Sequence, residues 1–63
     1  MTKVVLPEGN MIETGPGTVE EILFRLGFNP YEVLATADGC LLLGDEFCDA
    51  DTELRLTSIV HGG

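Results

Sequence analysis

The sequence predicts an α+β fold in which one helix packs on a mixed sheet of four to five strands, in the order β-β-α-β-β-β. Three observations indicate this. One segment has its apolar residues at helical spacing, two pairs of short apolar runs flank turn-forming residues, and the last apolar segment alternates with period two. A helix with a single apolar stripe buries that stripe against another element, so we expect the helix to form a layer on one face of the sheet.

The first two strands are predicted as a β-hairpin. Residues 3–6 form a short β-branched run, turn-forming residues follow at 7–10, and a second short run covers residues 11–14. The sequence Gly-Pro-Gly at 15–17 then ends the second strand.

A helix of about eight or nine residues follows, because both of its ends carry capping signals. Thr18 stands at the N-cap position, and Glu21 completes a capping box three residues later. Gly27 favours the left-handed conformation that ends a helix, and Pro30 lies just beyond it. The apolar residues that share one helix face are Val19, Ile22, Leu23 and Leu26.

A second hairpin is predicted around Asp38-Gly39, a dipeptide whose backbone tolerates the positive φ angles of tight turns. Apolar runs at 32–37 and 40–43 flank this dipeptide. Residues 44–51 are acidic and are predicted to form a loop, in which the carboxylates make a solvated face that steers the chain to a basic partner.

The last strand is predicted over residues 53–60, since leucines alternate there with charged residues as on a half-buried strand. The alternating residues are Glu53, Leu54, Arg55 and Leu56. We therefore expect one small domain over residues 1–60 and a flexible tail over residues 61–63.

The charge of the chain restricts its partners. With three basic and eleven acidic residues, the net charge is −8 at pH 7, which argues against binding to nucleic acid or to anionic lipid and favours a basic protein surface. The sequence has neither an apolar run of about 20 residues nor the regions of a signal peptide. We expect a cytoplasmic protein that is a monomer when free.

The terminal pair Gly62-Gly63 is the most unusual feature of the sequence. One interpretation is a frayed end without function. The other is a slender arm that enters a narrow channel and presents the Gly63 carboxylate as a reactive group. A carboxylate must first be activated, for instance as an acyl-adenylate, and the sequence contains no phosphate-binding motif. The chain would then be the substrate of an activating enzyme and not an enzyme itself.

These residues resemble a known family. Thr18-Val19 at the start of a short helix, the Asp38-Gly39 turn, the strand from residue 51 and the end in Gly62-Gly63 are similar to the ubiquitin-like sulfur carriers of the ThiS/MoaD type, which have a β-grasp fold. The resemblance implies that the first and last strands lie side by side in the middle of the sheet. This pairing would bury Val4 or Val5, together with Leu54 and Leu56.

The resemblance also implies a function. An E1-like adenylating enzyme (ThiF/MoeB-like) would use ATP-Mg to adenylate Gly63, a sulfurtransferase would supply sulfur, and the thiocarboxylate on Gly63 would donate sulfur to a sulfur-accepting synthase. Gly62 would keep the arm slender, and no cofactor would be permanently bound. The pathway stays open among thiamine, molybdopterin and tRNA thiolation, because the His61-Gly-Gly end and the residues Ala37-Asp38-Gly39 depart from the common pattern of the carriers.

Two other functions remain open on the sequence. The first is a ubiquitin-like protein modifier, whose terminal carboxylate forms isopeptide bonds with target lysines after the same activation step. The second is a β-grasp interaction module whose glycine end does not react.

Several further residues have two interpretations each. His61 either contacts the activating enzyme or keeps the arm in water. Ile59 and Val60 belong either to the sheet core or to a docking patch beside the tail. Cys40 is predicted as a core thiol and Cys48 as a loop thiol; a sulfur-relay role is disfavoured because acidic residues surround Cys48. No metal is expected, since the cysteine spacing matches no zinc motif and Leu54 stands where a calcium loop needs glycine.

Overall fold

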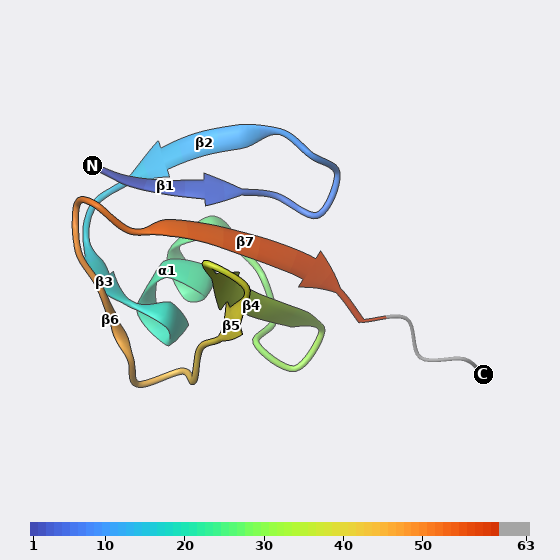
Figure 1. The fold of residues 1–63 in the computed structure, drawn as a ribbon. Coiled ribbons are helices and arrows are strands. Elements are labelled where there is room, and N and C mark those ends of the chain that lie inside the picture. The colour runs from blue at the N-terminus through green and yellow to red at the C-terminus, as the bar shows by residue number, and fades with distance from the viewer. Residues whose placement is uncertain (60–63) are drawn as a thin grey trace.

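The computed structural model describes residues 1–59, and within them the fold is α+β, with one helix on a mixed five-stranded sheet (Figure 1). In chain order the elements are β1 (Thr2–Val5), β2 (Met11–Thr14), β3 (Gly17–Thr18), α1 (Val19–Leu26), β4 (Val33–Ala37), β5 (Cys40–Leu41), β6 (Phe47–Cys48) and β7 (Glu53–Ser58). The five-stranded sheet has the order β2-β1-β7-β4-β5. No helix in the described part of the chain is long and apolar enough to cross a membrane.

The first and last strands lie side by side in the middle of the sheet, as expected. β1 runs parallel to β7 with Val4 opposite Leu54, and β4 pairs with the other edge of β7 in the antiparallel sense. The side chains of Val4 and Leu54 are fully buried, Val5 is 8% exposed and Leu56 is buried as well. The predicted core positions on these two strands are therefore confirmed.

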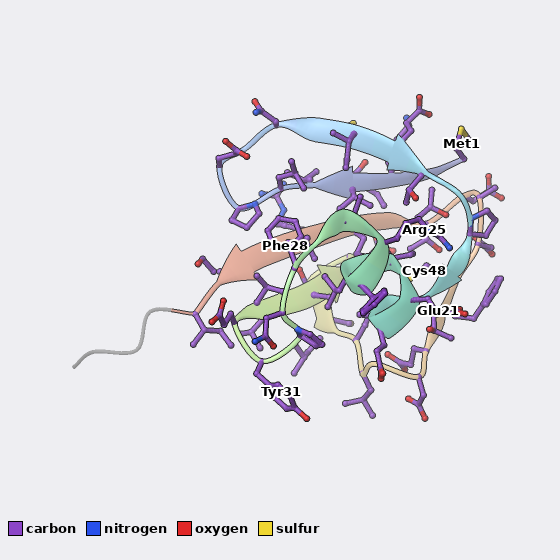
Figure 2. The ribbon with its side chains drawn as sticks, turned by 180° about the vertical axis from the view of Figure 1, so that it is seen from behind. Met1, Glu21, Arg25, Phe28, Tyr31 and Cys48 are labelled. Atoms are coloured by element: carbon purple, nitrogen blue, oxygen red, sulfur yellow. The ribbon has the colours of Figure 1, made fainter. Side chains whose placement is uncertain are left out.

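The core lies between the sheet and the helix (Figure 2). Because side chains alternate along each strand, every second residue of β1, β7 and β4 faces the helix. The buried residues of this cluster are Val4, Val19, Ile22, Leu23, Val33, Ala35, Cys48, Leu54 and Leu56. We call this side of the sheet the helix-covered face, and the opposite side the open face.

Both predicted ends of the helix are confirmed. The Glu21 N–H donates to Thr18 Oγ1 at 3.1 Å and the Thr18 N–H donates to Glu21 Oε1 at 2.9 Å, which completes the capping box. Gly27 has a φ of 84° at the C-cap and donates to the carbonyl oxygens of the last turn.

The structure adds two short strands that the sequence did not predict. β3 and β6 form a separate two-stranded sheet, in which Gly17 pairs with Cys48 and Thr18 with Phe47. β6 thus lies inside the acidic segment that was expected to be a loop throughout. Two-residue strands are too short to show the period-two pattern, so only tertiary structure reveals them. The last strand ends at Ser58, two positions before the predicted end.

Candidate functional site

The candidate site begins where β7 ends at Ser58, because the predicted site residues 59–63 follow this strand. β7 is the central strand of the sheet, paired with β1 on one edge and β4 on the other. Beyond it, the Ile59 N–H donates to the carbonyl oxygen of Glu32 at 2.8 Å, and the Ile59 side chain is half-buried. The chain is therefore tied to the sheet up to its last described residue. The other predicted site residues, 60–63, lie outside the described residues: Val60, His61, Gly62 and Gly63.

The turn before β4 supports this end of the sheet. The Tyr31 N–H donates to Asn29 Oδ1, and the Glu32 N–H donates to the Asn29 carbonyl oxygen, each at 2.9 Å. An Asx turn of this kind orders the local backbone. The carbonyl group that accepts from Ile59 is consequently held in place by its own segment, which gives the end of β7 a defined position.

The two cysteines exchange the roles that were predicted for them. Cys48 is buried in the core, whereas Cys40 is exposed. The pairing of β6 with β3 brings Cys48 beneath the helix, and the β4–β5 hairpin carries Cys40 out of the core. Burial raises the pKa of the Cys48 thiol, and the negative charges of Asp49 and Glu46 raise it further. Cys48 therefore stays protonated near neutral pH and is a poor nucleophile.

Two carboxylates of the acidic segment accept hydrogen bonds from nearby backbone N–H groups and from a hydroxyl group. Asp49 Oδ1 accepts from the Asp51 N–H at 2.9 Å and from Thr52 Oγ1 at 3.0 Å, while Glu46 Oε2 accepts from the Leu43 N–H at 2.8 Å. Among residues 1–59, no three His, Cys, Asp or Glu side chains come together in a way that could hold a metal ion. The acidic residues themselves are exposed, so they present negative charge to the solvent.

The acidic segment also closes the first turn of the helix. The Val19 N–H donates to the Glu46 carbonyl oxygen and the Glu20 N–H to the Gly44 carbonyl oxygen, both at 3.0 Å. The next amide, that of Glu21, is bound by the Thr18 hydroxyl. A phosphate group at a helix N-terminus needs free amides of this kind. Because all three are occupied, this helix does not offer a nucleotide site.

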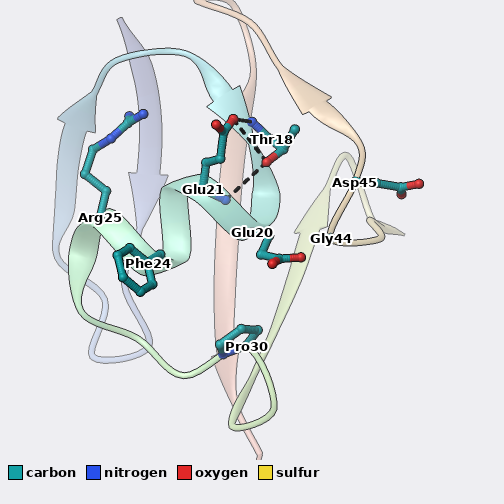
Figure 3. Close-up of a pocket in the computed structure, with 8 residues that line it drawn as sticks. All are labelled: Thr18, Glu20, Glu21, Phe24, Arg25, Pro30, Gly44 and Asp45. Atoms are coloured by element: carbon teal, nitrogen blue, oxygen red, sulfur yellow. Dashed lines mark hydrogen bonds between the residues drawn. The ribbon is translucent and has the colours of Figure 1, made fainter.

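A groove runs between the outward side of α1 and the start of the acidic segment (Figure 3). Its lining residues are Thr18, Glu20, Glu21, Phe24, Arg25, Pro30, Gly44 and Asp45. The Phe24 side chain is 84% exposed, although it is a large apolar group. The exposure of Phe24 could have been predicted from its position in the helical repeat. At 100° per residue, Phe24 lies opposite the buried stripe and between Glu20 and Glu21 around the helix.

Two of the charged side chains that line the groove, Glu21 and Arg25, have hydrogen-bond partners within the chain. Hydrogen bonds from the Thr18 backbone N–H and then from the Thr18 hydroxyl lower the pKa of Glu21, and the charge of Arg25 lowers it further. Glu21 is thus ionised at neutral pH. The Arg25 guanidinium donates to Thr14 Oγ1 at 3.0 Å and to the Gly15 carbonyl oxygen at 2.8 Å, which commits it to the segment before the helix.

Comparisons of the sequence with protein-family models and with curated proteins gave no match. The function is therefore inferred from the residues and the fold.

Proposed function

We propose that this chain is a sulfur carrier protein with a ubiquitin-like β-grasp fold, activated in the cytoplasm by a separate E1-like adenylating enzyme. The reactive group is the carboxylate of Gly63, and Gly62 lets the arm enter the channel of the activating enzyme. A sulfurtransferase and a sulfur-accepting synthase are the other partners. The chain is a co-substrate in this scheme and not a catalyst.

One observation carries the proposal: the strand that leads to the diglycine sequence is the central strand of the sheet. β7 is paired along both edges, and Ile59 is hydrogen-bonded to Glu32 at 2.8 Å. An arm that follows such a strand starts from a fixed point, and fixing one end of an arm reduces the entropy lost when its other end binds. This arrangement supports delivery of a terminal carboxylate to another protein.

The chemistry assigns each bond change to a partner. A Gly63 carboxylate oxygen attacks the α-phosphorus of ATP, which is held with magnesium by the adenylating enzyme, and pyrophosphate leaves. The terminal sulfur of a persulfide on the sulfurtransferase then attacks the acyl carbon, and AMP leaves with the oxygen that it gained. A second thiol of the transferase cleaves the resulting acyl disulfide, so that the transferase is oxidised to a disulfide and the thiocarboxylate is released. The resulting thiocarboxylate passes its sulfur to the synthase. The amides of the first turn of α1 already donate to acceptors within the chain, so they are not free to bind a phosphate group. This supports the assignment of ATP binding to another protein.

The proposal is tested by the intact mass of the chain isolated from its own host. We expect a mass that ends at Gly63 and a second fraction that is heavier by the difference between a sulfur and an oxygen atom. Alkylation with iodoacetamide should shift the second fraction by one more group than the first. A Cys40→Ala/Cys48→Ala variant should keep this extra group, because the thiocarboxylate provides the additional sulfur. A variant that lacks residues 62–63 should lose it.

The same experiment separates sulfur transfer from protein modification. If the activating enzyme is present and the heavier fraction is absent, the sulfur-carrier proposal is wrong. Immunoblots of the same host then show which alternative holds. A ladder of conjugates that depends on residues 62–63 indicates a protein modifier, and the absence of both products indicates an interaction module.

A further inference from the structure

The groove on the outward side of α1 combines an exposed aromatic ring with exposed carboxylates. We propose that it docks a basic segment of a partner protein. One apolar side chain of that segment packs against Phe24 and Pro30, and lysine or arginine residues on either side of it lie beside Glu20 and Asp45. This inference concerns the helix side of the molecule and holds whether or not Gly63 reacts.

The apolar part of the argument rests on Phe24. Its ring is 84% exposed on the helix face opposite the core, so the folded chain gains little from it. Burying an aromatic ring at an interface is favourable, and aromatic residues are enriched among those that carry binding energy. Pro30 lies across the groove from the helix and adds a second apolar surface (Figure 3). The groove can therefore hold an apolar side chain of a partner.

The charges select a basic occupant. Glu20 and Asp45 both line the groove, and both are exposed, so their carboxylates are open to a partner. Arg25 also lines the groove, but its guanidinium donates to Thr14 and Gly15. Opposite charges across an interface speed association and exclude like-charged partners. A second copy of this chain, with a net charge of −8, would be repelled by these carboxylates. A nucleic acid is also negatively charged and would be repelled in the same way.

The two walls of the groove are held together within the chain. The Glu20 N–H donates to the Gly44 carbonyl oxygen at 3.0 Å. A Cβ at Gly44 would lie 3.3 Å from Glu20 Oε2 and 3.6 Å from Glu20 Cβ, so glycine allows the loop to approach the helix closely. A groove that is formed before binding loses less entropy when the partner docks.

The test uses the full-length chain labelled with ¹⁵N and titrated with a synthetic amphipathic peptide that has leucines on one face and lysines on the other. We expect saturable shift changes at Glu20, Phe24 and Asp45. A second peptide with glutamates in place of the lysines should cause none. Phe24→Ala should raise the Kd by about tenfold, as expected for an aromatic anchor. Tyr31→Ala is the matched control, because Tyr31 is 85% exposed but does not line the groove, and it should change the Kd less than about twofold.

The charge contribution is tested separately. The double variant Glu20→Gln/Asp45→Asn should weaken binding and reduce its dependence on salt, whereas Glu8→Gln in the β1–β2 turn should do neither. Amide spectra of each variant without peptide report whether it is folded. The proposal is overturned if no saturable binding occurs, if the shifts map to the open face of the sheet, or if Tyr31→Ala weakens binding as much as Phe24→Ala does.

Discussion

The two faces of the five-stranded sheet carry similar kinds of residue in very different surroundings. On the helix-covered face, Leu54 is fully buried in the core. On the open face, Leu34 is 43% exposed, and two of the three basic residues of the chain, Lys3 and Arg55, are exposed as well. Successive side chains of a strand point to opposite faces of the sheet, so one set stabilises the core and the other set is open to solvent and to partners.

The charges of the two sides differ as well. Lys3 on the open face lies opposite Glu13 on β2 and Glu53 on β7, so carboxylates stand on either side of the lysine. On the helix side, Arg25 is the basic residue among residues 1–59 that lines the groove with Glu20 and Asp45, and its guanidinium is bound by Thr14 and Gly15. A basic partner therefore meets less competition on the helix side than on the open face.

The largest expected effect tests the difference between the two faces directly. Leu54→Ala removes a fully buried side chain and should lower the free energy of unfolding by about 3 kcal/mol, because it leaves a cavity. Leu34→Ala removes the same group from the open face and should cost about 1 kcal/mol or less. Urea unfolding followed by circular dichroism measures both values.

If Leu54→Ala is too unstable to measure, the milder Leu54→Val should still cost more than Leu34→Val. Equal losses at the two positions would contradict the division between the faces and would indicate that the open face is covered in solution, for example by a second copy. Repeating the measurement over a range of protein concentrations would then detect the association.

Much of the fold could be predicted from local patterns. The helix was located from the spacing of Val19, Ile22, Leu23 and Leu26 and from its two caps, all of which lie within a dozen residues of one another. The central pairing of β1 with β7 was different. It joins segments about 50 residues apart and has no local signature, so it came from the family resemblance and not from periodicity.

The elements that were missed depend on long-range contacts. β6 becomes a strand because Phe47 and Cys48 meet Thr18 and Gly17, which lie far away in the sequence. The same contact buries Cys48 and reverses the predicted roles of the two cysteines. The proposal for Gly62-Gly63 could be made from the sequence, because it depends on residue type alone. The groove could not be predicted in this way, because it needs the Glu20 N–H to find the Gly44 carbonyl oxygen.

A smaller effect is expected at the helix cap, which joins the helix side to the rest of the fold. Thr18→Ala removes the hydroxyl that binds the Glu21 N–H and should lower the free energy of unfolding by about 1 kcal/mol. The matched change on the open face, Thr57→Ala, should alter it by less than about 0.5 kcal/mol. Thermal melts are sensitive enough, since 1 kcal/mol shifts the Tm of a domain of this size by about 4 to 8 °C.

A conservative variant at the same position tests whether the Thr18 hydroxyl is the cause of the loss. Thr18→Ser keeps the hydroxyl and should restore most of the lost stability. If Thr18→Ser were as unstable as Thr18→Ala, the hydroxyl bond would not be the cause, and packing of the Thr18 methyl group beside β6 would have to explain the loss.

The smallest expected effect appears only at alkaline pH and compares the buried thiol with the exposed one. The pKa of Cys48 is raised by burial and by the charges of Asp49 and Glu46. As the pH rises past the usual thiol value of about 8.5, the unfolded chain loses this proton before the folded chain does. The folded state then binds more protons than the unfolded state, so its stability falls as the pH rises.

Cys48→Ala should therefore flatten the decline of stability between neutral and alkaline pH. The slope with pH is the quantity to compare, because Cys48→Ala also changes the packing of the core and shifts the absolute stability. A thiol reagent gives an independent measurement, since Cys40 is exposed and should react rapidly while Cys48 should react only when the chain unfolds. Rapid labelling of both thiols in the folded chain would show that β6 opens readily, and the helix side would then be the less stable of the two sides.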